Sequence, residues 1–356
     1  VENGHLMEAA GINGFYIKNC YFLNQTINTA TMTSTVPVYE AIQLDILEAT
    51  HSKGYTSEDL KNQNITVDSC TFQNVPRGVG NHTSILNNPT ENVKISNNIF
   101  ENISDVAIRC ERYLNLTIKG NVIKNCRNGI MVISLRNYGG TYLGSTLAAE
   151  GETTAVSSSE YCKPASDQKI VISNNTIICN DSVGNAGELS YGIRVEGARY
   201  TEDVVIEGKD TIPAGDYYIS GVKISNNSIK AIWYGIVLTN AKNVKVTSNQ
   251  LQCNPIADGY GIYLTQRSTK CTVTGNTITK FSGSGIYIDE GSSAKSVSEN
   301  TIKSIGAYGI VADATAVDKI LSNTVTNAGN KGIVAYNNAT VGRIEKNVVK
   351  TCSGYG

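Results

Sequence analysis

The residues that could do chemistry gather in the first part of this 356-residue chain. All three histidines, His5, His51 and His82, lie there. Around them stand acids, an amide and arginines that could build a polar site: Glu8, Glu40, Gln43, Asp45, Arg77, Arg109 and Glu111. Histidine and carboxylate side chains are common general acids and bases, and arginine binds carboxylates through two parallel hydrogen bonds. Together they indicate chemistry on an acidic substrate.

Attack on an acidic polysaccharide fits these residue types. A lyase must neutralise a uronate carboxylate, remove the neighbouring proton and help the leaving oxygen depart. A hydrolase instead needs two carboxyl groups that flank the bond. The catalytic candidates are Arg77, His82, Asp45, Glu40 and Arg109. The substrate-binding candidates are Glu8, Gln43, Glu111, His5, His51, Arg194, Tyr263 and Tyr287.

One metal ion is compatible with the candidates. Asp45 and Glu111 could hold Ca²⁺, a hard cation that prefers carboxylate oxygens. No other cofactor is indicated by the sequence.

Several candidates also have a purely structural interpretation. His51 lies in a polar segment, where an ordinary surface histidine is the simpler interpretation. Arg194 and Glu196 could form a solvated ion pair on a strand face. Tyr263 and Tyr287 could stack across neighbouring strands for stability alone, instead of stacking against a sugar.

The segment VPRGVGNH, which carries Arg77 and His82, lacks the clean alternation of its neighbours. Its proline and two glycines indicate a bent backbone and a close approach to another strand. Such distortions are common beside active sites. Because both side chains are expected outside the repeating core, their removal should cost little stability.

An internal repeat must position these side chains. VKISNNSI (Val222–Ile229) nearly repeats VKISNNIF (Val93–Phe100), and a Gly-Ile-x-apolar phrase follows most copies. The second Asn of each copy, or its substitute, recurs about every 22–28 residues apart from three longer intervals. These markers are Cys20, Cys70, Asn98, Asn121, Asn175, Asn227, Asn249, Asn276, Asn300, Asn323 and Asn347.

The repeat predicts an all-β solenoid. Strict alternation such as Val-Lys-Ile-Ser favours strands over helices. The period is too short for a propeller blade, and the L-x-x-L-x-L spacing of leucine-rich repeats is missing. A parallel β-helix of about eleven coils remains, with one strand from every coil in each of three sheets. The marker Asn is expected at a turn, where Asn tolerates a left-handed conformation, and in a ladder along the axis.

The Gly-Ile-x-apolar strands, once aligned, predict two rows of outward side chains. Gln43 and Asp45 begin the rows, and Arg109 and Glu111 continue them. Later coils place Arg194, Glu196, Val237, Thr239, Tyr263, Thr265, Tyr287 and Asp289 at the same positions. We expect Glu8, Gln43, Asp45, Arg77, His82, Arg109 and Glu111 to line one groove walled by Leu23–Tyr39 and Ile46–Gln63.

The Ile-Ser-Asn-Asn-x-Ile and Gly-Ile-x-Val phrases resemble those of the right-handed parallel β-helix superfamily, to which pectate lyases, polygalacturonases, alginate epimerases and some phage tailspikes belong. The resemblance covers the whole chain. It implies a right-handed solenoid with a substrate groove along the Gly-Ile-x-Val strands. It does not specify an activity, because the repeat is a scaffold on which sites are grafted.

The repeat predicts a single domain over residues 1–356, as a fragment of a longer chain, with loop-decorated coils in 1–220 and regular coils in 221–356. Loops on a rigid scaffold commonly carry function. The predicted insertions are Leu23–Tyr39, Ile46–Gln63, Ser134–Gln168, Asn180–Ser190 and Gly197–Ser220.

Composition restricts the partners. The net charge of -1, from 30 basic and 31 acidic residues, gives no reason to expect nucleic acid. No apolar run approaches the ~18 residues that span a bilayer. The nine cysteines lack zinc-site spacing and are expected to be small buried thiols.

The favoured function is a secreted or surface-attached bacterial protein, monomeric, that acts on a polysaccharide or a cell-surface glycan. Two alternatives remain open: a non-catalytic adhesin or carbohydrate-binding stalk, and a segment of a phage tail fibre.

Overall fold

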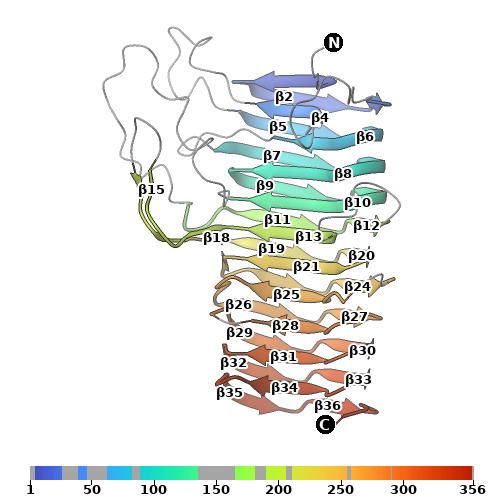
Figure 1. The fold of residues 1–356 in the computed structure, drawn as a ribbon. Coiled ribbons are helices and arrows are strands. Elements are labelled where there is room, and N and C mark those ends of the chain that lie inside the picture. Colours follow the sequence, from blue (N-terminus) through green and yellow to red (C-terminus); the bar gives the residue numbers. More distant parts are fainter. Residues whose placement is uncertain are drawn as a thin grey trace.

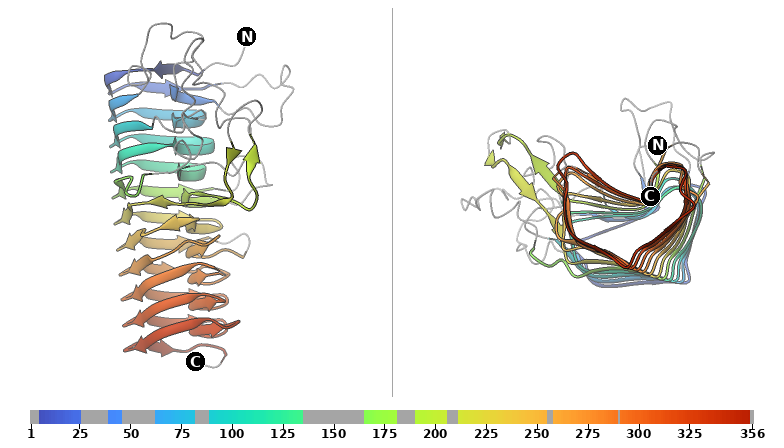
Figure 2. Two further views of the ribbon diagram at one scale, coloured as in Figure 1. Left: turned by 90° about the vertical axis from the view of Figure 1, so that its left-hand side faces the viewer. Right: turned by 90° about the horizontal axis from the view of Figure 1, so that it is seen from below.

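In the computed structural model, the described residues are 5–25, 39–45, 62–81, 89–134, 165–180, 190–205, 211–254, 258–289 and 291–354. Their strands stack coil upon coil into a parallel β-helix (Figures 1 and 2). The predicted fold class is therefore confirmed. Within these residues there is no helix long and apolar enough to cross a membrane.

The first strand of each coil belongs to an eleven-stranded parallel sheet, which agrees with the eleven coils predicted. Its strands are β2 (Asn13–Lys18), β5 (Gln63–Asp68), β7 (Thr90–Ser96), β9 (Tyr113–Lys119), β11 (Ile170–Ser173), β19 (Val222–Ser225), β23 (Lys245–Thr247), β26 (Cys271–Thr274), β29 (Ser293–Ser298), β32 (Ala316–Leu321) and β35 (Thr340–Glu345).

Nineteen of the remaining strands form one sheet with two faces. We call one the second-strand face: β3 (Tyr21–Leu23), β12 (Thr176–Cys179), β20 (Ser228–Ala231), β24 (Gln250–Cys253), β27 (Thr277–Thr279), β30 (Thr301–Ile305), β33 (Thr324–Ala328) and β36 (Val348–Lys350). The other, the Gly-Ile face, comprises β1 (Met7–Ala10), β4 (Glu40–Asp45), β13 (Tyr191–Glu196), β21 (Tyr234–Thr239), β25 (Ile262–Thr265), β28 (Ile286–Ile288), β31 (Ile310–Asp313) and β34 (Ile333–Tyr336).

Three long strands belong to both faces. They are β6 (Thr71–Gly80), β8 (Ile99–Glu111) and β10 (Val122–Ile133). The expected three strands per coil are thus separate in the later coils, as in β19, β20 and β21, whereas in these N-terminal coils the second and third are continuous.

One predicted insertion is visible as an arm beside the stack (Figures 1 and 2). β14 (Ala198–Tyr200) pairs antiparallel with β17 (Gly215–Tyr217), and β15 (Val204–Val205) pairs with β16 (Thr211–Ile212). The chain returns to the stack through β18 (Ile219–Ser220), which pairs with β22 (Ala241–Lys242). The other four insertions lie largely outside the described residues.

The interior is one apolar cluster of buried side chains, mainly Ile and Val, that extends from Ala9 to Ala328. Beside it, the predicted ladder is confirmed. From Asn98 to Asn347, each marker amide donates to the side-chain oxygen of the next at 2.9–3.0 Å. Cys70 continues the ladder, because its N–H donates to Asn98 Oδ1 at 2.8 Å.

The turn conformation falls one residue earlier than expected. The left-handed φ belongs to the residue before the marker, as in Asn97 (58°), Asn174 (55°) and Asn226 (56°). Where two Asn stand together, the first therefore makes the turn, and the second is buried and bonded.

Candidate functional site

The strand register places the predicted outward positions of the Gly-Ile face in two continuous rows. One row contains Glu8, Gln43, Gly80, Arg109, Met131, Arg194, Val237, Tyr263 and Tyr287. In the other, Glu111, Ile133, Glu196, Thr239 and Thr265 are successive partners. The register of β1 settles that Glu8 belongs to the first row.

Arg77 lies buried between two carboxylates at the N-terminal end of this face. Its Nη1 is 3.1 Å from Glu40 Oε1, and its Nε is 2.5 Å from Asp105 Oδ2. His5 Nδ1 lies 3.5 Å from Glu40 Oε2. Burial alone would lower the pKa of Arg77, but Asp105 and Glu40 outweigh it and raise that pKa. Arg77 is not part of the apolar core cluster, but the expectation that it is a surface residue is wrong, because its side chain is buried.

The irregular segment around Arg77 is a continuous strand, β6, and the distortion sits in its neighbour. Between Val75 and Arg77 the register with β8 shifts by one residue, so β8 carries a bulge that contains Asp105. The predicted close approach is present: a Cβ at Gly80 would lie 1.9 Å from the carbonyl oxygen of Arg109.

Arg109 and Glu111 form a second ion pair, and both are buried. Asn81 supports Glu111: its Oδ1 accepts the Glu111 N–H at 2.9 Å, and its Nδ2 donates to the Glu111 carbonyl at 3.0 Å. Arg77 and Arg109 are thus each matched by a nearby carboxylate.

Arg194 follows Arg109 two coils later in the same row. Its Nε lies 2.8 Å from Glu196 Oε2. The two residues are paired as that interpretation expects, but the pair is not fully solvated, because the Glu196 side chain is only 12% exposed. Burial raises the pKa of Glu196, although Arg194 and Arg109 both act against it. About a third of the Arg194 side chain stays exposed (32%), which makes it the accessible cation of these pairs.

The candidates do not all face solvent as predicted. Gln43 and Glu40 are buried, at 1% and 0% exposure. His51, His82 and the side chain of Asp45 lie outside the described residues, as do most of both predicted groove walls. The catalytic roles and the Ca²⁺ site therefore stay predictions. Within the described residues no three His, Cys, Asp or Glu side chains gather as a metal site.

Farther along the same row, the Gly-Ile face becomes aromatic. Tyr260 stacks on Tyr287 with ring centroids 4.8 Å apart and an angle of 9°, and Tyr234 stacks on Tyr263 at 5.9 Å. Trp233 stacks on Tyr234 at 5.9 Å. All five rings are partly exposed. We call these five residues the aromatic cluster.

Sequence reasoning found Tyr263 and Tyr287 but missed the other three rings. The signal was present, because Tyr234 and Tyr260 each stand directly before the Gly of a Gly-Ile phrase. The residue before the Gly packs against the outward row of the next coil. Tyr234 therefore stacks on Tyr263, and Tyr260 stacks on Tyr287.

Two carboxylates fix the tyrosine hydroxyls. Tyr263 donates to Asp289 Oδ2 at 2.9 Å, and Tyr287 donates to Asp313 Oδ2 at 2.5 Å. Burial raises the pKa of Asp289. Burial would also raise the pKa of Asp313, but hydrogen bonds from Tyr287 and two neighbours outweigh it and lower that pKa. The cluster thus offers flat ring faces beside acceptor oxygens.

Comparison with known proteins assigns the family. Residues 165–353, more than half of the chain, match the model of the NosD family, described as periplasmic copper-binding protein. The chain belongs to the NosD family.

Relatives of this NosD-family chain include a pneumococcal protein. The plasmin and fibronectin-binding protein A of Streptococcus pneumoniae is 27% identical over 130 residues, which are 33% of this chain but only 18% of that protein. The solved structure of the S. pneumoniae surface protein and adhesin PfbA matches with a TM-score of 0.55 and 14% identity, over 83% of this chain and 76% of that one.

A polysaccharide-modifying enzyme shares the fold as well. The A-module of the mannuronan C-5 epimerase AlgE6 of Azotobacter vinelandii matches with a TM-score of 0.51 and 12% identity, over 81% of this chain and 64% of that one. At these identities the structural likeness concerns the fold alone, which adhesins and enzymes share.

Proposed function

We propose that this NosD-family chain is an extracellular or cell-surface protein that binds a polysaccharide or cell-surface glycan through the aromatic cluster. The observation that carries the proposal is the set of five partly exposed rings on consecutive coils of one rigid face. Sugar rings present C–H faces that pack against aromatic faces, and a tyrosine combines a flat apolar body with a polar tip.

The geometry favours an extended glycan. Tyr263 and Tyr287 are register partners on adjacent strands, so their positions repeat at the strand spacing of ~4.8 Å. Asp289 and Asp313 stand beside them and can accept hydrogen bonds from sugar hydroxyls. Because these carboxylates already hold the tyrosine hydroxyls, little side-chain freedom remains to be lost when a ligand binds.

The pneumococcal relative supports a surface role, because the solved structure is described as a surface protein and adhesin. The relative's own name refers to plasmin and fibronectin. The buried ion pairs of Arg77 and Arg109 argue against catalysis at the N-terminal end, since a side chain held by buried partners is poorly placed to contact substrate.

Hydrolysis of the bound glycan is the second candidate function. The pKa values of Asp289 and Asp313 are shifted in opposite directions, up and down, on the same aromatic face. Two carboxyl groups whose pKa values are shifted apart can share the acid and base roles of a glycosidase. A lyase would depend instead on the N-terminal candidates.

Copper binding, which the family description names, does not fit the residues of the matched segment 165–353. The matched residues 165–353 contain no histidine and no methionine. Their buried thiols are poor copper ligands, because binding requires the thiolate. Burial raises the pKa of Cys179, Cys253 and Cys271 to about 12.

A panel of immobilised neutral and acidic polysaccharides tests the proposal. The protein should be retained by at least one polymer without releasing products from it. New reducing ends would support the hydrolase instead, and new unsaturated ends would support the lyase. Retention by none of the polymers would overturn the glycan-binding function.

A further inference from the structure

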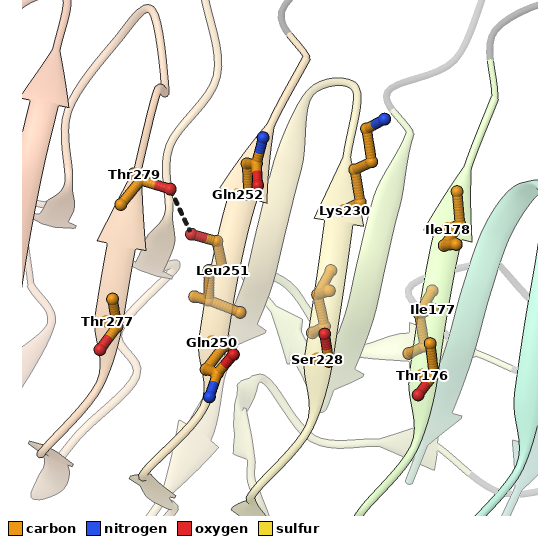
Figure 3. A pocket seen from close by; sticks show the side chains of 11 residues that line it. Thr176, Ile177, Ile178, Ser228, Lys230, Gln250, Leu251, Gln252, Thr277 and Thr279 are labelled. Atoms are coloured by element: carbon orange, nitrogen blue, oxygen red, sulfur yellow. Dashed lines mark hydrogen bonds between the residues drawn. The ribbon is translucent and has the colours of Figure 1, made fainter.

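A second surface of the solenoid also has the features of a ligand site. The second-strand face contains a hollow of about 340 Å³. Outward side chains of β12, β20, β24 and β27 line it: Thr176, Ile178, Ser228, Lys230, Gln250, Gln252, Thr277 and Thr279 (Figure 3). Nearly all of these end in a hydroxyl, an amide or an ammonium group.

The hollow belongs to two longer rows set by the strand register. One row is neutral and hydrogen-bonding: Thr176, Ser228, Gln250, Thr277, Thr301 and Thr324. The other contains four lysines among Ile, Gln and Thr: Lys124, Ile178, Lys230, Gln252, Thr279, Lys303, Thr326 and Lys350.

The charge of these rows differs from that of the Gly-Ile face. The four lysines are exposed, and none of them forms an ion pair with another described residue. From Lys124 onward the two rows contain no acid. Among the residues that the structure describes, Glu101 is the register partner of Lys124 one coil earlier, and Glu299 lies at the corner that precedes Thr301. The positive charge of the rows is therefore not neutralised within them.

The lysines are spaced along the axis. Lys124 and Lys230 are two coils apart, Lys303 follows three coils later, and Lys350 two coils after that. At the strand spacing, these separations are roughly 10, 14 and 10 Å. These distances are two or three strand spacings, so they suit a stiff chain that carries one negative charge on every unit of about that length.

We propose that the second-strand face binds a linear anionic polysaccharide, with its carboxylates or sulfates on the lysine row and its hydroxyls on the Thr/Gln row. The site is separate from the aromatic cluster and does not depend on it. A single-stranded nucleic acid fits less well, because neither row offers an aromatic ring on which bases could stack between Lys124 and Lys350.

Paired charge reversals test this site. The probe is fluorescein-labelled polygalacturonate, with unlabelled dextran as the neutral polymer. Lys230→Glu with Lys303→Glu should weaken binding about tenfold or more, because exposed charges act mainly through electrostatic attraction. Binding by the parent should also weaken as salt is raised. The control, Lys223→Glu with Lys245→Glu, changes net charge equally on the neighbouring sheet and should leave affinity within about twofold of the parent.

Equal losses in the two double variants would overturn the site in favour of an unspecific charge effect. So would full competition by dextran, or tighter binding of a single-stranded oligonucleotide than of polygalacturonate. Tyr287→Ala should leave polygalacturonate bound at this face, which distinguishes failure here from failure of the proposed function. The melting temperatures of both double variants should match that of the parent, since the four lysines replaced in them are all exposed.

Discussion

Removal of Arg77 should destabilise the fold strongly. In Arg77→Ala, Glu40 loses its 3.1 Å partner while its carboxylate stays fully buried. Breaking a buried ion pair from one side costs about 3–5 kcal/mol. Asp105 adds little to this cost, because its side chain is 24% exposed and can be hydrated. The free energy of unfolding in urea should therefore fall by about 3–5 kcal/mol.

Two further variants make this measurement decisive. Arg343→Ala breaks an Arg–Glu pair whose side chains are 56% and 46% exposed, and should cost no more than about 1 kcal/mol. The double variant Arg77→Met with Glu40→Gln should be more stable than Arg77→Ala, since it removes both buried charges of the pair and leaves no unpaired carboxylate at residue 40. If Arg77→Ala unfolds like the parent, the buried ion pair is not structural, and a ligand-binding role for Arg77 becomes the better explanation.

The remaining predictions concern the ladder and the carboxylates. Asn276→Ala removes hydrogen bonds to Asn249, Val246 and Asn300 and leaves buried polar groups unpaired. It should lower the free energy of unfolding in urea by about 3–5 kcal/mol. The control Asn226→Gly changes an exposed turn residue and should cost under about 1 kcal/mol. Because the folded pKa of Asp313 is lowered, its stabilisation is present above the ordinary Asp pKa and lost as pH falls through the folded value. Asp313→Asn should remove this part of the acid-induced drop in melting temperature below about pH 4, and an unchanged pH profile would contradict the assignment.

Local patterns were enough to predict the fold. Alternation and the 22–28-residue period identified the coils, and the marker series located the ladder down to Cys70. The one error in the ladder was which Asn of each pair makes the turn. Both residues favour left-handed backbone, so the sequence alone does not distinguish the residue with positive φ from the one that is buried.

The site was harder to predict because its contacts join different coils. Glu40 and Arg77 are 37 residues apart, and Asp105 meets Arg77 through a bulge in β8. Aligned phrases placed Arg109, Glu111, Tyr263 and Tyr287 in their rows correctly. They did not reveal that the charged side chains bury one another, since burial depends on what packs across the row.

Fluorescence of Trp233, the single tryptophan of the chain, tests glycan binding by the aromatic cluster most directly. Titration of the parent with a neutral polysaccharide that the panel retains should change the emission of Trp233 and saturate. Tyr287→Ala should weaken binding by roughly tenfold, equivalent to ~1.4 kcal/mol. Tyr16→Ala, which removes a 61% exposed ring from β2 on another sheet, should bind like the parent. Equal affinities of Tyr287→Ala and the parent, or retention of the glycan without any change in Trp233 emission, would contradict binding at this cluster.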